Sequence, residues 1–336
     1  MFKVTKTKII SKRKEKYLSF PDIIKSPKAK DRFFLVYRDG DGHHPTWSNL
    51  ILMQSNNNGK TWKKKNSFPL KIRNDDYVWN CPRLSYVDDI LYITCDQKSG
   101  TFERMAQFKT VQLTSKKEGD FFRLQETAIP GMLPDKIIEF QGDLFCANHK
   151  IKNIKNELIQ LVSWSRDGGA TWYDTNIVAH SYTKQFCEAS VVNMGDYLIA
   201  YLRDNSGHKR NIYTVKSYDG VHWSEPEKLP IFGQRVTAIR EGNKVIGTYR
   251  NSDLTRNKGT LYKDPESFCY ISIFEHDLDT GEIEVSHIEK EYAHNQYHCG
   301  YTGIAKVSKD SYLVTYYIMK DADNPFIKLA FVSKIK

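Results

Sequence analysis

The chain has 336 residues, of which 40% are hydrophobic and 13% aromatic, with 20 Tyr and 17 Phe, and this composition suits β-sheets. It contains no run of about 18 apolar residues, which excludes a membrane-spanning helix. The net charge of +10 favours anionic partners such as acidic glycans, but the basic residues are scattered and no RNP, zinc-finger or helix-turn-helix pattern is present, so nucleic acid is not expected as a partner.

The N-terminal residues 1–16 are basic and do not resemble a targeting segment. The stretch "MFKVTKTKIISKRKEKY" has no apolar core of roughly seven residues and no small-residue cleavage site, so we expect no secretory signal. It is expected to be a solvated arm or a strand that closes the fold. The expected location is the cytoplasm, or the cell exterior after non-classical release.

Six pairs of apolar strands, each pair separated by a short polar turn, follow one another along the chain. The first strands are predicted at 17–24, 80–87, 133–140, 187–193, 235–240 and 301–307, and the second strands at 31–38, 88–95, 141–148, 194–203, 242–250 and 309–317. Each unit of about 56 residues has room for two further strands. The sequence therefore predicts an all-β fold, a six-bladed β-propeller of four-stranded antiparallel blades that forms one domain over residues 1–336.

A polar loop recurs four times between the predicted strands. Asp or Ser can bond the backbone of such a turn, and Gly supplies its positive φ. The copies are "SNNNGKTW" (Ser55–Trp62), "SKKEGDFF" (Ser115–Phe122), "SRDGGATW" (Ser165–Trp172) and "SYDGVHW" (Ser217–Trp223). Trp62, Trp172 and Trp223 are expected to cover their loops and to be structural. The last two blades carry no clear copy, and the region near Asp277–Glu284 is expected to be a degenerate hairpin.

The six cysteines are at positions 81, 95, 146, 187, 269 and 299, and none forms a C-x-x-C pair. Most lie inside apolar strands. This pattern predicts buried free thiols in a reducing compartment, and neither a disulfide framework nor a zinc site. No metal and no cofactor are expected.

The repeated loop resembles the Asp-box, Ser-x-Asp-x-Gly-x-Thr-Trp, of the sialidase-like β-propellers. In that family the box joins the outer strands of a blade away from the active site, so the resemblance implies an architecture for nearly the whole chain. Sialidases hold the substrate carboxylate with three arginines, whose guanidinium groups suit carboxylates. They use a Tyr nucleophile paired with a Glu, and an Asp as the acid/base.

Four residues match the sialidase pattern. Glu188 opens the first strand of the fourth unit and matches the Glu, and Arg203, 15 residues later, matches an arginine of the clamp. In "HCGYTGIAKV", Tyr301 falls on the nucleophile. Arg250, at the end of a second strand, fits the third arginine. Alternatives for this third arginine are Arg256 in the following loop and, less well placed, Arg235.

The first unit departs from the pattern. The family has Arg-Ile-Pro here, whereas this chain has Ser19 and Phe20 before Pro21. Arg38, on the neighbouring strand, can supply the missing charge. The acid/base is expected about 12 residues before Ser55, where the chain has Asp41, His43 and His44. A His beside aspartates can do acid/base work near neutral pH, or the loop can bind a sugar hydroxyl.

Two functions follow from the resemblance, and both imply a carbohydrate partner. The first is a retaining, sialidase-like exo-glycosidase acting on a terminal, acidic sugar. Tyr301 would be the nucleophile, Glu188 its proton acceptor, Arg203 and Arg250 the anion clamp, and Asp41 or His43 the acid/base. The second is a non-catalytic glycan-binding propeller of the adhesin or virus and phage receptor-binding type, which explains the missing first arginine. A shared fold alone does not decide between them.

Overall fold

Strands are the regular elements of this protein, and the described residues contain no helix. The structure is a computed structural model, and it describes residues 1–69, 77–99, 107–126, 129, 131–151, 157–179, 181, 183–206, 210–251, 268–292, 299–319 and 324–335. The middle strands are apolar along nearly their whole length. Ser311–Ile318, for example, is buried at seven of its eight positions. A strand covered on both faces shows such a continuous apolar run in place of alternation.

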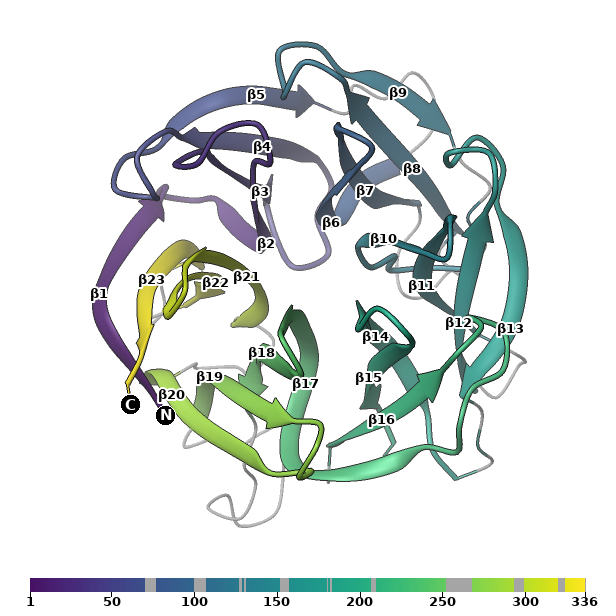
Figure 1. The fold of residues 1–336 in the computed structure, drawn as a ribbon. Helices are drawn as coiled ribbons and strands as arrows, with labels where there is room; N and C mark the ends of the chain where they lie inside the picture. The colour runs from purple at the N-terminus through teal and green to yellow at the C-terminus, as the bar shows by residue number, and fades with distance from the viewer. Residues whose placement is uncertain are drawn as a thin grey trace.

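The strands form six antiparallel blades around a central axis, one for each predicted unit, and blades 4 and 5 share one continuous seven-stranded sheet (Figure 1). Blade 1 contains β2 (Tyr17–Lys25), β3 (Phe33–Gly40), β4 (Ser48–Ser55) and β5 (Lys63–Pro69); blade 2 contains β6 (Tyr77–Val87), β7 (Ile90–Ser99), β8 (Gln107–Ser115) and β9 (Arg123–Glu126); blade 3 contains β10 (Ile137–Phe140), β11 (Asp143–Ile151), β12 (Leu158–Ser165) and β13 (Tyr173–Ala179). Blade 4 contains β14 (Phe186–Asn193), β15 (Leu198–Asp204), β16 (Asn211–Ser217) and the first part of β17 (Glu227–Glu241); blade 5 contains the rest of β17, β18 (Lys244–Asn251), β19 (Phe268–Asp277) and β20 (Ile283–Tyr292); blade 6 contains β21 (Gly300–Ser308), β22 (Ser311–Ile318), β23 (Phe326–Lys334) and β1 (Phe2–Ser11).

Strand β17 belongs to two blades. Its first part pairs with β16, from Thr214↔Glu227 to Asn211↔Phe232, and its second part pairs with β18 from Gly233↔Asn251 onward. The described residues therefore make up six four-stranded blades. The predicted all-β propeller is confirmed, and each of the twelve predicted strands overlaps an observed one.

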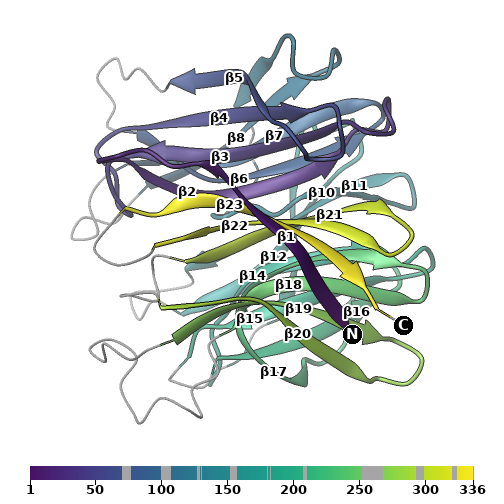
Figure 2. The same ribbon diagram turned by 90° about the vertical axis from the view of Figure 1, so that its left-hand side faces the viewer.

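The N-terminal strand closes the ring. β1 is the outermost strand of blade 6 and pairs antiparallel with β23, from Phe2↔Lys334 to Ser11↔Ile327. The two termini consequently lie side by side (Figure 2). Most of the basic N-terminal segment is thus a closing strand, the second of the two alternatives that its sequence left open.

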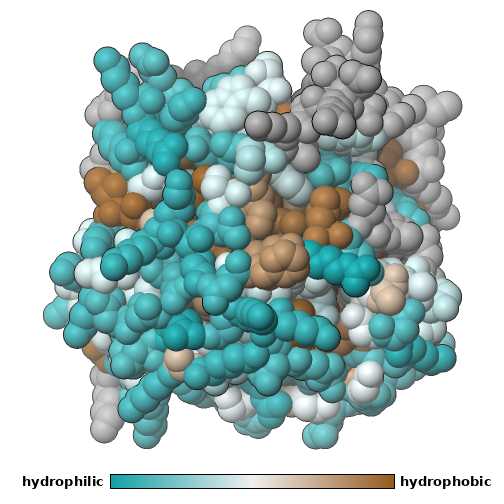
Figure 3. Space-filling view, turned by 90° about the horizontal axis from the view of Figure 1, so that it is seen from above, coloured by the Kyte–Doolittle hydropathy of each residue, from teal (hydrophilic) through white to brown (hydrophobic). Residues whose placement is uncertain are grey.

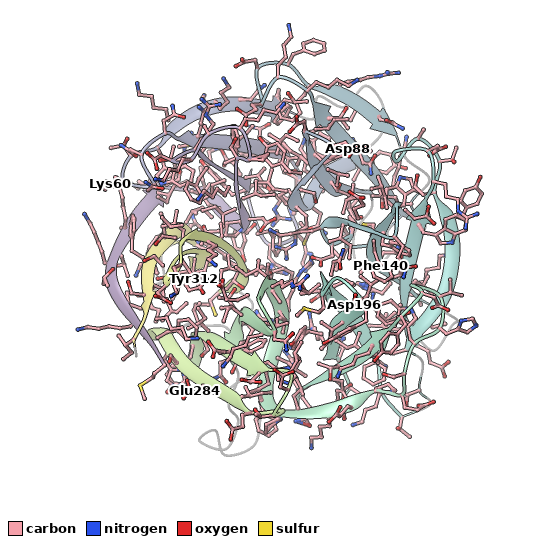
Figure 4. The ribbon with its side chains drawn as sticks, in the orientation of Figure 1. Lys60, Asp88, Phe140, Asp196, Glu284 and Tyr312 are labelled. Carbon is pink, nitrogen blue, oxygen red and sulfur yellow. The ribbon has the colours of Figure 1, made fainter. Side chains whose placement is uncertain are left out.

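The core consists of apolar layers between neighbouring blades, where side chains fill the space between the sheets (Figure 4). Between blades 1 and 2, for example, Phe34 and Leu52 pack against Leu84 and Ile93. The side of the propeller in Figure 3 is mostly hydrophilic. Outer strands such as β5 carry lysines, which discourage pairing with another sheet edge.

The four polar loops share one hydrogen bond. In each, the Oγ of the first serine accepts the backbone N–H of the glycine that lies three or four residues later, at a distance of 2.9–3.0 Å. The pairs are Gly59 with Ser55, Gly119 with Ser115, Gly169 with Ser165, and Gly220 with Ser217. The indole of Trp172 donates to the Gly169 carbonyl at 3.0 Å and is only 6% exposed. Each loop joins the third and fourth strands of its blade along the chain, and none of its residues lines the cavity described below. The loops therefore fasten hairpins.

The cysteine prediction is wrong at one position. Cys81, Cys95, Cys146 and Cys187 are buried free thiols, as expected. Cys299, however, takes part in a disulfide. Pairing of cysteines depends on which strands become neighbours, and spacing along the chain does not show this.

Replacing Trp172 by Ala is expected to lower the free energy of unfolding by about 3 kcal/mol, because the change removes a large, packed indole. The matched control is Tyr173→Ala, since Tyr173 is the next residue but is 51% exposed. Its loss should cost about 0.5 kcal/mol or less. Urea unfolding monitored by circular dichroism measures both. Equal costs for the two variants would show that the loop tryptophan is not a staple.

Candidate functional site

In every blade, one residue in or just before the innermost strand has a left-handed backbone conformation. Among the described residues, twelve non-glycine residues have a positive φ, and one in each blade lies at an equivalent inner position. These six are Phe20 (54°), Cys81 (46°), Leu133 (51°), Glu188 (49°), Arg235 (42°) and Tyr301 (42°), and we call them the axial ring. In five blades the strand ladder shifts register at this residue, which marks a β-bulge. Such a bulge redirects a side chain at a cost of about 1–3 kcal/mol of backbone strain.

The axial ring contributes to the wall of one cavity of about 270 Å³. Five of its six members line this cavity, and Arg235 does not. The lining residues are Phe20, Arg38, His43, His44, Pro45, Val78, Asn80, Cys81, Lys98, Met132, Leu133, Glu188, Arg203, Arg250 and Tyr301. The structure thus brings together most of the residues that the sequence singled out, and these come from blades 1, 4, 5 and 6.

A phenol and a carboxylate meet in this cavity. The Tyr301 hydroxyl donates to Glu188 Oε1 at 2.7 Å, although the two residues are 113 positions apart. The Arg203 guanidinium donates to the other carboxylate oxygen, Oε2, at 2.6 Å. All three side chains are largely buried, and the charge-assisted bond to Arg203 fixes the carboxylate in place.

The charges around Glu188 keep it ionised. Burial alone raises the pKa of this carboxyl, but the guanidiniums of Arg203 and Arg235 outweigh burial and bring the pKa well below its usual range. For Tyr301 the balance is the opposite, because burial and the Glu188 carboxylate raise the pKa of the phenol well above its usual value. The pair therefore rests as a neutral phenol that donates to a carboxylate.

Two further arginines reach the cavity. Arg250 donates to the Cys299 carbonyl at 3.0 Å, two residues before Tyr301. Arg38 stands directly opposite Ser19 in the ladder, and its Nε donates to the Ser19 hydroxyl at 3.1 Å. Its guanidinium lies 4.5 Å from the centre of the Phe20 ring. The small serine thus leaves room for a guanidinium from the neighbouring strand.

The loop after β3 contributes both histidines but not its aspartate. His43 and His44 line the cavity, and His43 Nδ1 lies 3.1 Å from the Tyr17 hydroxyl. Burial, with Lys98 and Arg38 nearby, lowers the pKa of His44 to about 4. Asp41 accepts the Thr46 N–H at 2.8 Å and also the Thr46 hydroxyl, and it is not among the lining residues. Its carboxylate caps the loop.

Some residues escaped the sequence analysis. Cys81, Leu133, Asn80 and Lys98 line the cavity, but no motif pointed to them. One signal was available: Phe20, Cys81 and Leu133 each precede a proline at the same place in three successive units. Arg256 lies outside the described residues. In the part of the chain that the structure describes, no group of three or more His, Cys, Asp or Glu side chains could hold a metal ion.

Gly300 allows Tyr301 and Arg250 to approach. Its φ is +108°, and an added Cβ would lie 2.9 Å from the Arg250 Cβ. Gly300→Ala is therefore expected to lower the free energy of unfolding by about 3 kcal/mol, from backbone strain and overpacking together. Gly168→Ala is the matched control, because Gly168 has a φ of +67° with nothing within 4 Å, and it should cost only about 1 kcal/mol. Urea unfolding compares them, and equal costs would mean that the contact with Arg250 is unimportant.

The chain is similar to a known protein family in sequence and to several solved structures in fold. Residues 88–265 match the family described as BNR repeat-like domain. No curated protein sequence matches the chain. Among solved structures, a protein of unknown function from Dyadobacter fermentans is 17% identical, with a TM-score of 0.82 and 99% of each chain covered.

Two enzymes share the fold at lower similarity. The sialidase of Trypanosoma rangeli, solved with 2,3-difluorosialic acid as a covalent intermediate, is 14% identical with a TM-score of 0.65; the match covers 94% of this chain and 54% of the sialidase. An α-L-arabinofuranosidase of Fusarium graminearum is 10% identical with a TM-score of 0.66, and the match covers 94% of this chain and 93% of the enzyme. At such identities the likeness concerns the fold. The family match spans more than half of the chain, which therefore belongs to the BNR repeat-like domain family.

Proposed function

We propose that this protein is a retaining exo-glycosidase that removes a terminal, acidic sugar, with Tyr301 as the nucleophile. The observation that carries the proposal is the 2.7 Å hydrogen bond from the Tyr301 hydroxyl to the Glu188 carboxylate inside a cavity. A nucleophile within reach of a base, itself held by a third group, is the usual arrangement of an activated nucleophile. Here Arg203 is the third group.

The choice of a phenol fits an acidic substrate. A carboxylate nucleophile would repel a substrate that carries a negative charge beside the reacting carbon, whereas a neutral phenol does not. Tyr301 would attack the anomeric carbon while its proton passes to Glu188 Oε1, and the glycosidic bond breaks at the same carbon. Water would then displace the phenol oxygen, and Glu188 would return the proton. Two displacements retain the configuration.

The cations of the cavity favour an anionic sugar. Arg38, Arg203, Arg250 and Lys98 line it, and Glu188 is the one carboxylate among the lining residues that the structure describes. Guanidinium groups bind carboxylates through paired hydrogen bonds. The volume of about 270 Å³ is at the small end for a ligand site, which suits one terminal sugar and hence exo-cleavage.

We assign the acid/base role to His43. It lines the cavity and contacts the Tyr17 hydroxyl, whereas Asp41 is engaged by Thr46. His44 is a poorer proton donor, because a pKa of about 4 leaves it neutral at pH 7. His43 would protonate the leaving oxygen and then take a proton from the attacking water. His44 would bind a hydroxyl or an anionic oxygen of the sugar.

A second candidate is a glycan-binding propeller without turnover. It is favoured by two observations: Ser19 stands where sialidases have an arginine, and Asp41 faces its own loop. A panel of acidic glycans separates the two functions. Binding of a glycan by calorimetry, with no release of its terminal sugar over days, would support the binding module.

Tyr301→Phe is expected to lower kcat for an acidic glycoside roughly 10³-fold or more, while leaving the dissociation constant nearly unchanged, because the shape is kept and the nucleophile lost. The matched control is Tyr316→Phe. Tyr316 is also buried and its hydroxyl also donates to a glutamate, Glu289, but it lies outside the cavity. Its activity should equal that of the wild type. Turnover that survives in Tyr301→Phe would remove Tyr301 from the nucleophile role.

A further inference from the structure

Arg235 belongs to the axial ring but does not line the cavity. Its ring position lies between those of Glu188 in blade 4 and Tyr301 in blade 6. The carbon of its guanidinium is 5.3 Å from the centre of the Tyr301 ring, and the residue is 1% exposed. Tyr301 lines the cavity whereas Arg235 does not, so Arg235 can act on the reaction only through its neighbours.

The guanidinium of Arg235 is poorly satisfied for a buried charge. Its NH2 group donates to the Pro134 carbonyl at 3.4 Å and lies 3.7 Å from an Asp135 oxygen. Its Nε and NH1 atoms have no hydrogen-bond partner among the described residues. A buried charge without full pairing is costly, so its retention calls for a compensating role.

A second arginine shares the same buried surroundings and provides a comparison. Arg83 is 2% exposed, lies 3.8 Å from the carboxylates of both Asp22 and Asp135, and also has an unpartnered Nε within the described residues. It donates to the Thr302 carbonyl at 3.3 Å and has no recorded ring contact with Tyr301. The two arginines thus differ in that only Arg235 lies against the phenol, and Arg235 also acts on the charge of Glu188.

Several charged or titratable groups act on the Tyr301 hydroxyl from different strands. They are Cys81 on β6, Glu188 on β14, Arg203 on β15, Arg235 on β17 and Arg250 on β18. Burial and Glu188 raise the pKa of the phenol, while Arg203 and Arg235 lower it. Arg203 has the larger effect but is bound to Glu188 at 2.6 Å, whereas Arg235 has no carboxylate within hydrogen-bond distance among the described residues. Arg235 is therefore a buried cation beside the phenol that no hydrogen-bonded carboxylate neutralises.

We propose that Arg235 is a positioning residue that stabilises negative charge on the Tyr301 oxygen from behind the aromatic ring. The part of this proposal that concerns catalysis rests on the proposed glycosidase function. Negative charge develops on that oxygen twice: when its proton moves to Glu188 as the bond to the anomeric carbon forms, and when water breaks that bond and the electron pair returns to the phenol. A cation over a ring attracts even a neutral aromatic, and it attracts a phenolate more strongly.

The test titrates residue 301 without any substrate. Tyr301 is replaced by 3,5-difluorotyrosine, whose hydroxyl is more acidic, and phenolate absorbance is followed against pH in the full chain. Arg235→Gln in this background is expected to raise the pKa of the phenol by about one unit or more, a tenfold change in its ionisation constant. Arg83→Gln, the matched control, removes the same charge from the same buried surroundings and should shift the pKa by no more than a few tenths of a unit.

Equal shifts in the two variants, or no shift in Arg235→Gln, would overturn the proposal. If Arg235→Gln does not fold, Arg235→Lys is used instead. The lysine side chain is shorter, so its ammonium group lies farther from the ring, and the pKa of the phenol must rise. An unchanged pKa in Arg235→Lys would also overturn the proposal. Once a glycoside that the protein cleaves is known, Arg235→Gln should lower kcat about 10- to 100-fold at constant KM. The titration needs no substrate, so its result holds even if the glycosidase proposal fails. Failure of the Arg235 proposal can therefore be told apart from failure of the glycosidase proposal.

Discussion

A left-handed residue near the start of each inner strand is the constraint on which the whole site depends. An ordinary strand would alternate its side chains between the two faces of a blade, and none would point along the axis. The positive φ, together with a bulge in five of the six blades, turns one side chain per blade out of that alternation. The six blades are arranged around one axis (Figure 1). The redirected side chains therefore come close together, and five of the six line the cavity.

The strain at these positions has a chemical consequence. Glu188 and Tyr301 occupy two of the six positions, and their hydrogen bond of 2.7 Å exists because both backbones are bent. The remaining positions give the cavity an apolar side, with Phe20 and Leu133, and a cation behind the phenol, Arg235. The strands that hold Glu188 and Tyr301 are largely buried and paired with their neighbours, and such rigid surroundings are what keeps strained residues in place.

The repeat of strands was readable from the sequence, because hydrophobic runs and polar turns are local signals. The sialidase resemblance pointed to Glu188, Arg203 and Tyr301, and the structure places the three in one cavity. Contacts between residues that become neighbours only in the folded chain were not predictable from the sequence. Ser19 leaves room for Arg38 only because the two are paired across a ladder, and Asp41 is engaged by Thr46 through the folding of its own loop. The disulfide of Cys299 is of the same kind.

Covalent labelling tests most directly whether Tyr301 bonds to a sugar. Fluorinated acidic sugars, beginning with 2,3-difluorosialic acid, slow the second displacement, because fluorine destabilises the positive charge at the anomeric carbon. The sugar then stays on the nucleophile, and mass spectrometry of the digested protein locates it. We predict one sugar on the peptide that contains Tyr301, and none in Tyr301→Phe. An adduct on another residue, or no adduct with any sugar of the series, would contradict the assignment.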